Sequence, residues 1–250
     1  MKILYLIAAR GGSKSIPRKN LETIEGLSLV GFKARAARQA RSCARLILSS
    51  DSPEIQAEAR AHGAETPFTR PAHLATDAAT TADVVRHAMD WIEDERAGVY
   101  DAVMLLEPSS PFASGRDFDQ AAELMKRTDA TAVIGVREME VNSIFTGPME
   151  PNGSIRPIVE KFATRTRTAR QQLEPEYTMN GALYLFRWDR FRATGAIYSD
   201  PDRTYGYLMD RRYSVEIDEP VDLEWARFLA REGHVDLDPW LNHRAAVAIG

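Results

Sequence analysis

Residues 3–20 read ILYLIAARGGSKSIPRKN, and this stretch decides the fold of the 250-residue chain. Its first five residues, 3–7, form an apolar run typical of a buried β-strand. Gly11 and Gly12 follow, and paired glycines let a backbone approach a ligand without a Cβ in the way. Four cations lie within ten residues of this loop: Arg10, Lys14, Arg18 and Lys19. A strand that leads into such a loop indicates a phosphate-binding site, although an ordinary surface turn has the same composition. The loop has neither the Walker A spacing nor the GxGxxG pattern.

The composition of the whole chain is that of a globular protein, with 44% hydrophobic and 27% charged residues. The net charge of −4 argues against a general nucleic-acid-binding surface. Cys43 is the only cysteine, which excludes an intrachain disulfide and favours a reducing compartment. No apolar run approaches the ~20 residues of a membrane span, and the first apolar run enters a charged loop instead of a signal-peptide cleavage site. We therefore expect a cytoplasmic protein with no membrane or nucleic-acid partner.

Strand-like runs alternate with helical patterns in the first half of the chain. Strands are expected at 46–50, 103–106 and 130–136, and helices at 29–44, 53–62, 80–95 and 114–126. Ser52 and Ser114, and Thr80 or Thr81, are suitable N-caps for the last three helices. Further on we expect strands at 182–186 and 214–217 and a helix at 221–232. This order predicts an α/β fold with a mostly parallel sheet and helices on both faces.

The alternation breaks after about Glu138. Residues 139–176 contain four prolines and many polar residues, so they form either a long loop system or an inserted subdomain. We treat 1–250 as a single domain with an insertion at about 139–176.

Polar residues follow several of the expected strands, at the edge where open parallel sheets bind ligands. Besides the 10–20 loop, this edge receives Ser50 and Asp51, the segment 107–111, Asn180 with Gly181, and Glu216 with Asp218. Cations, hydroxyls, amides and a carboxylate pair together suit an enzyme that handles a nucleotide and a second polar substrate.

Glu216 and Asp218 are separated by one residue, so on a strand both side chains would share a face. Two such carboxylates repel unless a cation lies between them, and Mg²⁺ prefers oxygen ligands and often joins carboxylates to phosphates. The alternative is that Asp218 only caps the helix that begins near Pro220.

Two other groups of polar residues have open interpretations. Arg165, Arg167, Arg170, Gln171 and Gln172 form either a solvated loop or a cap over an anionic sugar. The five histidines have neither metal-ligand nor catalytic-triad spacing, and we expect them to be structural or at the surface.

Several segments, taken in order, resemble the acylneuraminate (CMP-sialic acid) cytidylyltransferases. They span about residues 1–232 and comprise 10–20, Arg70-Pro71 with Leu74-Ala75 and Asp77, 108–111, 170–172, 180–184 and 216–218. The resemblance implies a Rossmann-like nucleotidyltransferase fold and a homodimer in which the insertion reaches the partner subunit. It also implies a reaction in which CTP and a sialic-acid-like nonulosonic acid give the CMP-sugar and pyrophosphate.

The resemblance also assigns roles to residues of this chain. Arg10, Lys19 and Asp218 would be catalytic, and Asp218 with Glu216 would hold Mg²⁺. The residues implied to bind the nucleotide are Ala8, Arg10, Gly11, Gly12, Ser13, Asn20, Arg70 and Asp77. Those implied to bind the sugar are Glu107, Ser109, Ser110, Arg170, Gln171, Asn180 and Tyr184.

The chain departs from the family pattern at three positions. Glu216 stands where the acidic pair usually begins with Asp, and its extra methylene displaces the carboxylate. Glu107 stands where many members have Gln, which suggests a modified nonulosonic acid, such as pseudaminate or legionaminate, as acceptor. Ser15 stands where a glycine is common, and it is tolerated if its φ is negative.

Other functions stay open at this point. The chain could be a related sugar nucleotidyltransferase of the CMP-Kdo type, or one that uses GTP. A glycosyltransferase with a DxD-like site is more distant, because the acidic pair here lies late in the chain. A non-catalytic nucleotide or sugar sensor is the alternative from another class.

Overall fold

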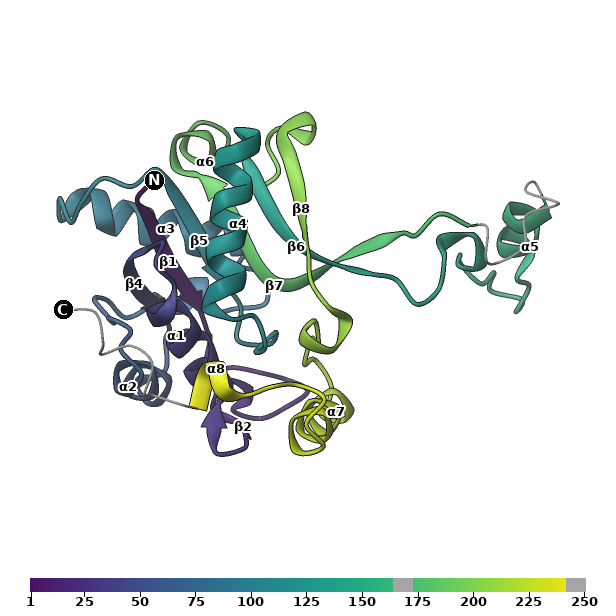
Figure 1. Ribbon diagram of the computed structural model, residues 1–250, viewed down its shortest axis with the longest axis horizontal. Helices are drawn as coiled ribbons and strands as arrows, with labels where there is room; N and C mark the ends of the chain where they lie inside the picture. Colours follow the sequence, from purple (N-terminus) through teal and green to yellow (C-terminus); the bar gives the residue numbers. More distant parts are fainter. Residues whose placement is uncertain (164–172, 242–250) are drawn as a thin grey trace.

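The computed structural model describes residues 1–163 and 173–241. Its centre is a six-stranded sheet with the order β4-β1-β5-β7-β6-β8 (Figure 1). The strands are β1 (Ile3–Ala8), β4 (Cys43–Ser49), β5 (Ala102–Leu106), β6 (Ala132–Glu138), β7 (Tyr177–Arg187) and β8 (Thr204–Leu208). β7 runs antiparallel to β5 and β6, whereas the β1–β4, β1–β5 and β6–β8 pairs are parallel. The prediction of a mostly parallel sheet is confirmed, with β7 as the one reversed strand of this sheet.

Helices cover both faces of the sheet because alternate side chains of a buried strand point to opposite sides. Ile3, Tyr5 and Ile7 of β1 pack with α1 (Leu29–Gln39) and α4 (Gly115–Thr128). Leu4 and Leu6 pack with α3 (Thr81–Asp94) and α6 (Trp188–Thr194) on the other face. The remaining helices are α2 (Pro53–Ala61), α5 (Arg156–Ala163), α7 (Pro220–Arg231) and α8 (Asp238–Leu241). A short hairpin joins β2 (Thr23–Ile24) and β3 (Leu27–Ser28).

Most helix starts follow from local capping. Ser52, Thr80 and Ser114 are the N-caps of α2, α3 and α4, and the last two form capping boxes. The predicted end of the first helix is wrong, since α1 stops at Gln39. Its C-cap Ala40 has an extended backbone, and the chain already enters β4 at Cys43.

The second half of the chain departs more from the prediction. Residues 214–217 are not a strand: they follow a short 3₁₀ helix at Arg211–Tyr213, and the backbone N–H of Ile217 donates to the Ser109 carbonyl. β8, which pairs with β6, was not predicted because its sequence TYGYL contains no apolar run. β7 begins at Tyr177, five residues before the expected start.

The insertion forms an arm. Figure 1 shows α5 at the far end of the continuing β6 and β7 chains, away from the rest of the molecule. Ser143 Oγ bonds to a carboxylate oxygen of Glu176 at 2.8 Å and ties the two sides of the arm together. On α5 and just before it, Ile155, Val159 and Phe162 are each at least half exposed.

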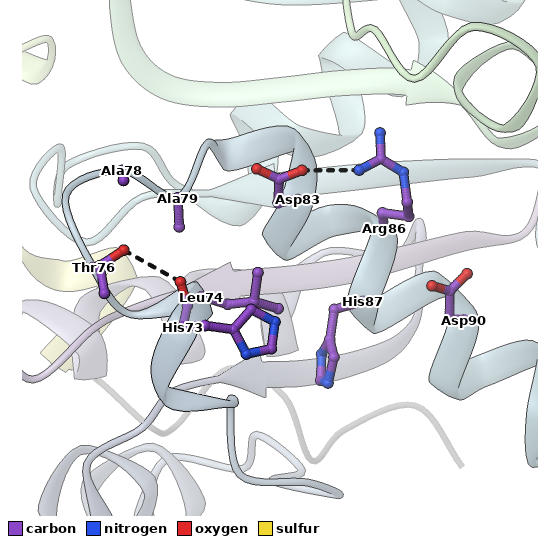
Figure 2. A pocket seen from close by; sticks show the side chains of 9 residues that line it. All are labelled: His73, Leu74, Thr76, Ala78, Ala79, Asp83, Arg86, His87 and Asp90. Carbon is purple, nitrogen blue, oxygen red and sulfur yellow. Dashed lines mark hydrogen bonds and ion pairs between the residues drawn. The ribbon is translucent and has the colours of Figure 1, made fainter.

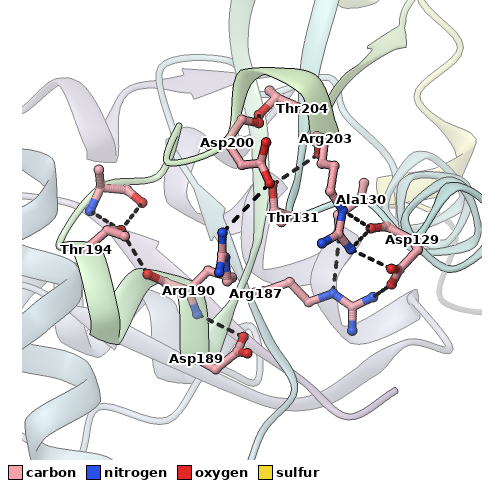
Figure 3. Close-up of polar contacts among 11 residues, drawn as sticks. Asp129, Ala130, Thr131, Arg187, Asp189, Arg190, Thr194, Asp200, Arg203 and Thr204 are labelled. Atoms are coloured by element: carbon pink, nitrogen blue, oxygen red, sulfur yellow. Dashed lines mark hydrogen bonds and ion pairs between the residues drawn. The ribbon is translucent and has the colours of Figure 1, made fainter.

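The edge of the sheet at the start of the parallel strands is closed by ion pairs (Figure 3). Arg187 and Arg203 both bind the carboxylate of Asp129, at 3.0 and 2.5 Å, and Arg190 lies 3.8 Å from Asp200. The opposite edge, where the parallel strands end, carries the expected ligand-binding residues. Within the described part of the chain, no helix is long and apolar enough to cross a membrane.

Candidate functional site

The loop after β1 is held in place by hydrogen bonds between its backbone and polar side chains. The N–H of Gly11 donates to Asp51 Oδ1 at 2.9 Å, and a Cβ on Gly11 would lie only 3.1 Å from Ser52 Cβ. Buried Asn20 donates through Nδ2 to the Arg10 carbonyl at 2.9 Å. Gly12 is exposed and Ser13 half-buried on the same loop. Ser15 does not have a positive φ, so this departure from the family pattern causes no backbone strain.

Two cations of this loop converge on one carboxylate. Arg10 Nη2 lies 2.8 Å and Lys14 Nζ 2.5 Å from the oxygens of Asp77. Hydrogen bonds from Lys14 and Arg10 lower the pKa of Asp77. The Asp77 carboxylate therefore lies in front of the loop, where Arg10 and Lys14 can both bind an anion.

A third cation joins the loop to the acidic pair. Lys19 Nζ donates to the Ile217 carbonyl at 2.8 Å and lies 3.2 Å from Asp218 Oδ1. Ser15 Oγ also donates to the Asp218 carbonyl. Residues separated by about two hundred positions thus meet at the same edge of the sheet.

Asp218 is not the cap of the following helix. The N-cap of α7 is Glu219, and the carboxylate of Asp222 accepts from the backbone N–H groups of Asp218 and Glu219 at 3.0 and 2.8 Å. The Asp218 side chain is 67% exposed and directed to Lys19, so the capping interpretation is wrong.

Glu216 is an exposed residue of this acidic segment, between the buried Val215 and Ile217. A Cβ built on Gly181 would lie 2.9 Å from Glu216 Oε1, which shows how closely β7 passes. Burial raises the pKa of Glu216, and the charge of Asp218 raises it further, while Lys19 and Arg137 oppose the shift.

The acidic pair could hold a hard cation. Its donors are carboxylate oxygens, which Mg²⁺ prefers, and the charge of Asp218 acts on Glu216. Residues 1–163 and 173–241 contain no group of three or more His, Cys, Asp or Glu able to hold a metal. Further ligands would therefore come from substrate phosphates, backbone or water, as is usual for Mg²⁺.

A pocket of about 270 Å³ opens beside the loop on the α3 face of the sheet. Its walls include five of the predicted residues: Ala8, Arg10, Arg70, Asp77 and Glu107. The rest of the lining consists of residues that the sequence did not assign to a site: Leu74, Thr76, Ala79, Thr80, Thr81 and Val84.

Arg70 is 5% exposed and fixed to the end of β4. It donates from Nε to Ser49 Oγ at 3.0 Å and from Nη2 to the Ser49 carbonyl at 2.6 Å. Burial lowers its pKa to about 10. The guanidinium group is therefore a fixed positive wall of the pocket.

Glu107 directly follows β5 and lines the same pocket. Burial raises the pKa of its carboxyl to about 7, and the charge of Glu216 acts in the same direction. Burial also raises the pKa of Tyr184 and Tyr198, with Glu107 as the next cause for each. These three side chains therefore lie within electrostatic range of one another.

Other predicted sugar-binding residues turn inward. Ser110 Oγ donates to the Asn180 carbonyl at 2.9 Å, and Asn180 Nδ2 donates to Ser214 Oγ at 3.0 Å. Both side chains are buried, so they stabilise the junction between β5, β7 and the acidic segment. Ser109 contributes its carbonyl to the same junction through Ile217. Arg170 and Gln171 lie outside the described residues.

A second pocket of about 510 Å³ lies behind the loop that carries Asp77. Figure 2 shows His73 and Leu74 on the loop side and Arg86, His87 and Asp90 on α3. Leu74, Thr76 and Ala79 line both pockets, so the loop is a thin wall between them.

Sequence reasoning missed Lys33, which is fully buried on α1 near the site. A signal was present in the helical spacing, because position 33 is four residues from both Leu29 and Ala37 on the apolar stripe.

Comparison with known proteins gives a consistent result. A family model described as Cytidylyltransferase matches residues 4–148, more than half of the chain. A CMP-N,N'-diacetyllegionaminic acid synthase from Legionella pneumophila is 31% identical over 90% of this chain and 94% of the relative. A pseudaminic acid cytidylyltransferase from Campylobacter jejuni is 28% identical over 94% of this chain and 98% of the relative.

Among solved structures, the chain is similar to CMP:2-keto-3-deoxy-manno-octonic acid synthetase complexed with CTP. The TM-score is 0.63 at 17% identity, over 93% of this chain and all of the other. At this identity the likeness concerns the fold, and it confirms the predicted Rossmann-like nucleotidyltransferase architecture.

Proposed function

Because the chain belongs to the acylneuraminate (nonulosonic acid) cytidylyltransferase family, we propose that it transfers CMP from CTP to the anomeric hydroxyl of a nonulosonic acid and releases pyrophosphate. The observation that carries the proposal is the contact of Lys19 with the Ile217 carbonyl and Asp218. This contact joins the cationic loop to the acidic pair, beside the pocket lined by Arg10 and Arg70.

In the proposed reaction, negative charge develops on the pyrophosphate as it leaves the α-phosphorus. The anomeric oxygen forms a bond to the α-phosphorus, and the bond from that phosphorus to the oxygen that bridges to the β-phosphate breaks. Pyrophosphate leaves with this oxygen, and the hydroxyl proton passes to water. Arg10 and Lys19 would neutralise the charge of the triphosphate and of the reacting phosphoryl group, which is usually the largest part of such catalysis. Lys14 would assist at the triphosphate, since it already shares an anion with Arg10.

The nucleoside end would occupy the pocket lined by Arg70 and Thr81. Ala8, Gly11, Gly12, Ser13 and Asn20 remain proposed parts of the nucleotide site, with Asn20 acting through the Arg10 carbonyl.

Glu216 and Asp218 would hold Mg²⁺ through their carboxylate oxygens. When bound, Mg²⁺ would shield the leaving pyrophosphate and favour ionisation of the acceptor hydroxyl. Lys19 already pairs with Asp218, so this chain provides one positive charge at the position even before the ion binds.

The acceptor would lie near Glu107 and Tyr184. A carboxylate repels the acid group of a sugar but accepts a hydrogen bond from an amide, amine or hydroxyl. We therefore propose a modified nonulosonic acid as acceptor, and the names of the legionaminic and pseudaminic relatives support this direction. Arg170 and Gln171 keep their proposed roles at the sugar.

A homodimer and a cytoplasmic location also belong to the proposal. The exposed apolar side chains of the arm, Ile155, Val159 and Phe162, are suited to cover a second copy of the chain. Light scattering after size-exclusion chromatography would give a dimer mass, and a monomer at micromolar concentration would contradict it.

Pyrophosphate release tests the activity. CTP and Mg²⁺ would be combined with N-acetylneuraminate, legionaminate, pseudaminate and Kdo in turn, with GTP in place of CTP as a nucleotide control. We expect release with CTP and one modified nonulosonic acid, and at least a ~100-fold lower kcat for Lys19→Met. Lys126→Met, which removes a surface amine paired with Glu123 on α4, is the matched control. Measurable CTP binding without release with any acceptor would favour a sensor.

A further inference from the structure

Lys33 is a buried amine that the proposed reaction does not use. Its side chain on α1 is 0% exposed, and its Nζ lies 5.6 Å from the ring centre of Phe118. The amine donates one hydrogen bond, to the Ala182 carbonyl at 2.8 Å. Among the described residues, the carboxylates that act on this amine are those of Asp117 and Glu107, and both act through charge without a hydrogen bond.

Such an amine is costly for the fold. Removing an ammonium group from water without a direct counter-ion costs several kcal/mol. Burial accordingly lowers the pKa of Lys33 to about 7, against the opposing attraction of Asp117 and Glu107. A hydrophobic residue would be the ordinary choice on this stripe of α1, so the amine calls for a reason outside packing.

The acceptor of its hydrogen bond lies next to the site. Ala182 follows Gly181, which has a φ of +65°, and a Cβ built on Gly181 would lie 2.9 Å from both Glu216 Oε1 and Ser110 Oγ. β5 and β7 pair Leu105 with Tyr184. Beyond this pair the two chains lead to Glu107, which directly follows β5, and to Ala182, whose carbonyl accepts the hydrogen bond from Lys33.

Lys33 and Glu107 also influence each other's charge. Lys33 favours the carboxylate form of Glu107, and Glu107 favours the ammonium form of Lys33. The other charged groups that act on Glu107 are Glu216, Asp218 and Lys19. Lys33 is the one among these four groups that lies beneath the sheet, out of reach of solvent and nucleotide.

We propose that Lys33 is a positioning residue for the acceptor: from beneath the sheet it fixes the β7 segment at Ala182 and offsets the charge of Glu107. With Lys33 in place, the Glu107 carboxylate selects an acceptor that bears a hydrogen-bond donor. The inference rests on the proposed function and adds a residue that determines acceptor preference.

A double-mutant cycle tests it, with Lys33→Met, Glu107→Gln and the double variant assayed by pyrophosphate release. We expect Lys33→Met to raise KM for the best acceptor about tenfold while KM for CTP changes less than about twofold. The effects of the two substitutions on kcat/KM should not multiply. The double variant should therefore have a kcat/KM no lower than that of the less active single variant. Lys33→Gln, which keeps a donor for Ala182, should recover part of the loss, and Lys126→Met should match the unmodified enzyme.

Different assay results would contradict the inference and the proposed function. Equal rises in KM for CTP and acceptor, or effects that multiply, would show general loosening and overturn the inference. An unchanged acceptor KM in Lys33→Met would overturn it too. Absence of release by the unmodified enzyme with every acceptor would overturn the proposed function itself. If Lys33→Met does not fold, the same comparison is made with Lys33→Gln.

Discussion

Replacing Lys33 by Met should make the folded protein more stable while it impairs the acceptor site. Methionine has a similar length and shape, so it fills the space under the sheet without a cavity. It removes the cost of burying an amine whose side chain is 0% exposed. Stability and function would then change in opposite directions, as is common where an active site retains a locally unfavourable group.

The magnitude follows from the pKa of the buried amine. Burial lowers it from 10.5 to about 7, and each pKa unit corresponds to about 1.4 kcal/mol, so the buried amine costs the fold about 5 kcal/mol below pH 7. The variant loses the hydrogen bond to the Ala182 carbonyl, which costs about 1–3 kcal/mol. A net gain of about 2–4 kcal/mol at pH 7 is therefore expected, within the range seen when buried charges are replaced by apolar residues.

The sign of the pH dependence gives a second readout. The folded-state pKa is the lower one, so between about pH 7 and 10.5 the unfolded chain binds more protons. The stability of the unmodified protein should rise with pH through this window, and that contribution is absent from Lys33→Met. The advantage of the variant should shrink by about 1.5–2 kcal/mol between pH 7 and 8.5.

Urea denaturation at fixed protein concentration, from pH 7 to 8.5, measures both quantities. Lys126→Met should show neither the gain nor the pH-dependent difference. A variant that is less stable than the unmodified protein at every pH would refute the reasoning, and so would a gain that does not vary with pH.

Three further predictions concern the site. Asp77→Asn should free two loop cations and tighten CTP binding about two- to fivefold in calorimetry, a small effect because exposed ion pairs are weak; weaker binding would contradict it. The kcat/KM for the acceptor should fall as pH drops through about 7, because Glu107 then takes up a proton, and Glu107→Gln should remove this step from the pH profile; a persisting step would assign it to another group. Gly181→Ala should lower stability by about 1–3 kcal/mol, since the φ is +65°, and should weaken the Mg²⁺ dependence by displacing Glu216; an unchanged Mg²⁺ titration would argue against a role for Glu216.

Much of the fold followed from local patterns. Apolar runs of five and four residues placed β1 and β5, and Ser52, Thr80 or Thr81, and Ser114 indicated three helix starts, because these signals act over one helical turn or one strand. β8 was not predicted, because an edge strand with exposed side chains needs no apolar run.

The sequence by itself determined the mostly parallel sheet, the cationic loop and the residue types at the end of the strands. Only the tertiary structure decided which of these residues meet. The contact of Lys19 with Ile217 and Asp218 spans about two hundred positions and depends on the order of the strands in the sheet. Likewise, the inward turn of Asn180 and the burial of Lys33 result from packing between β7, the acidic segment and α1, which no local pattern encodes.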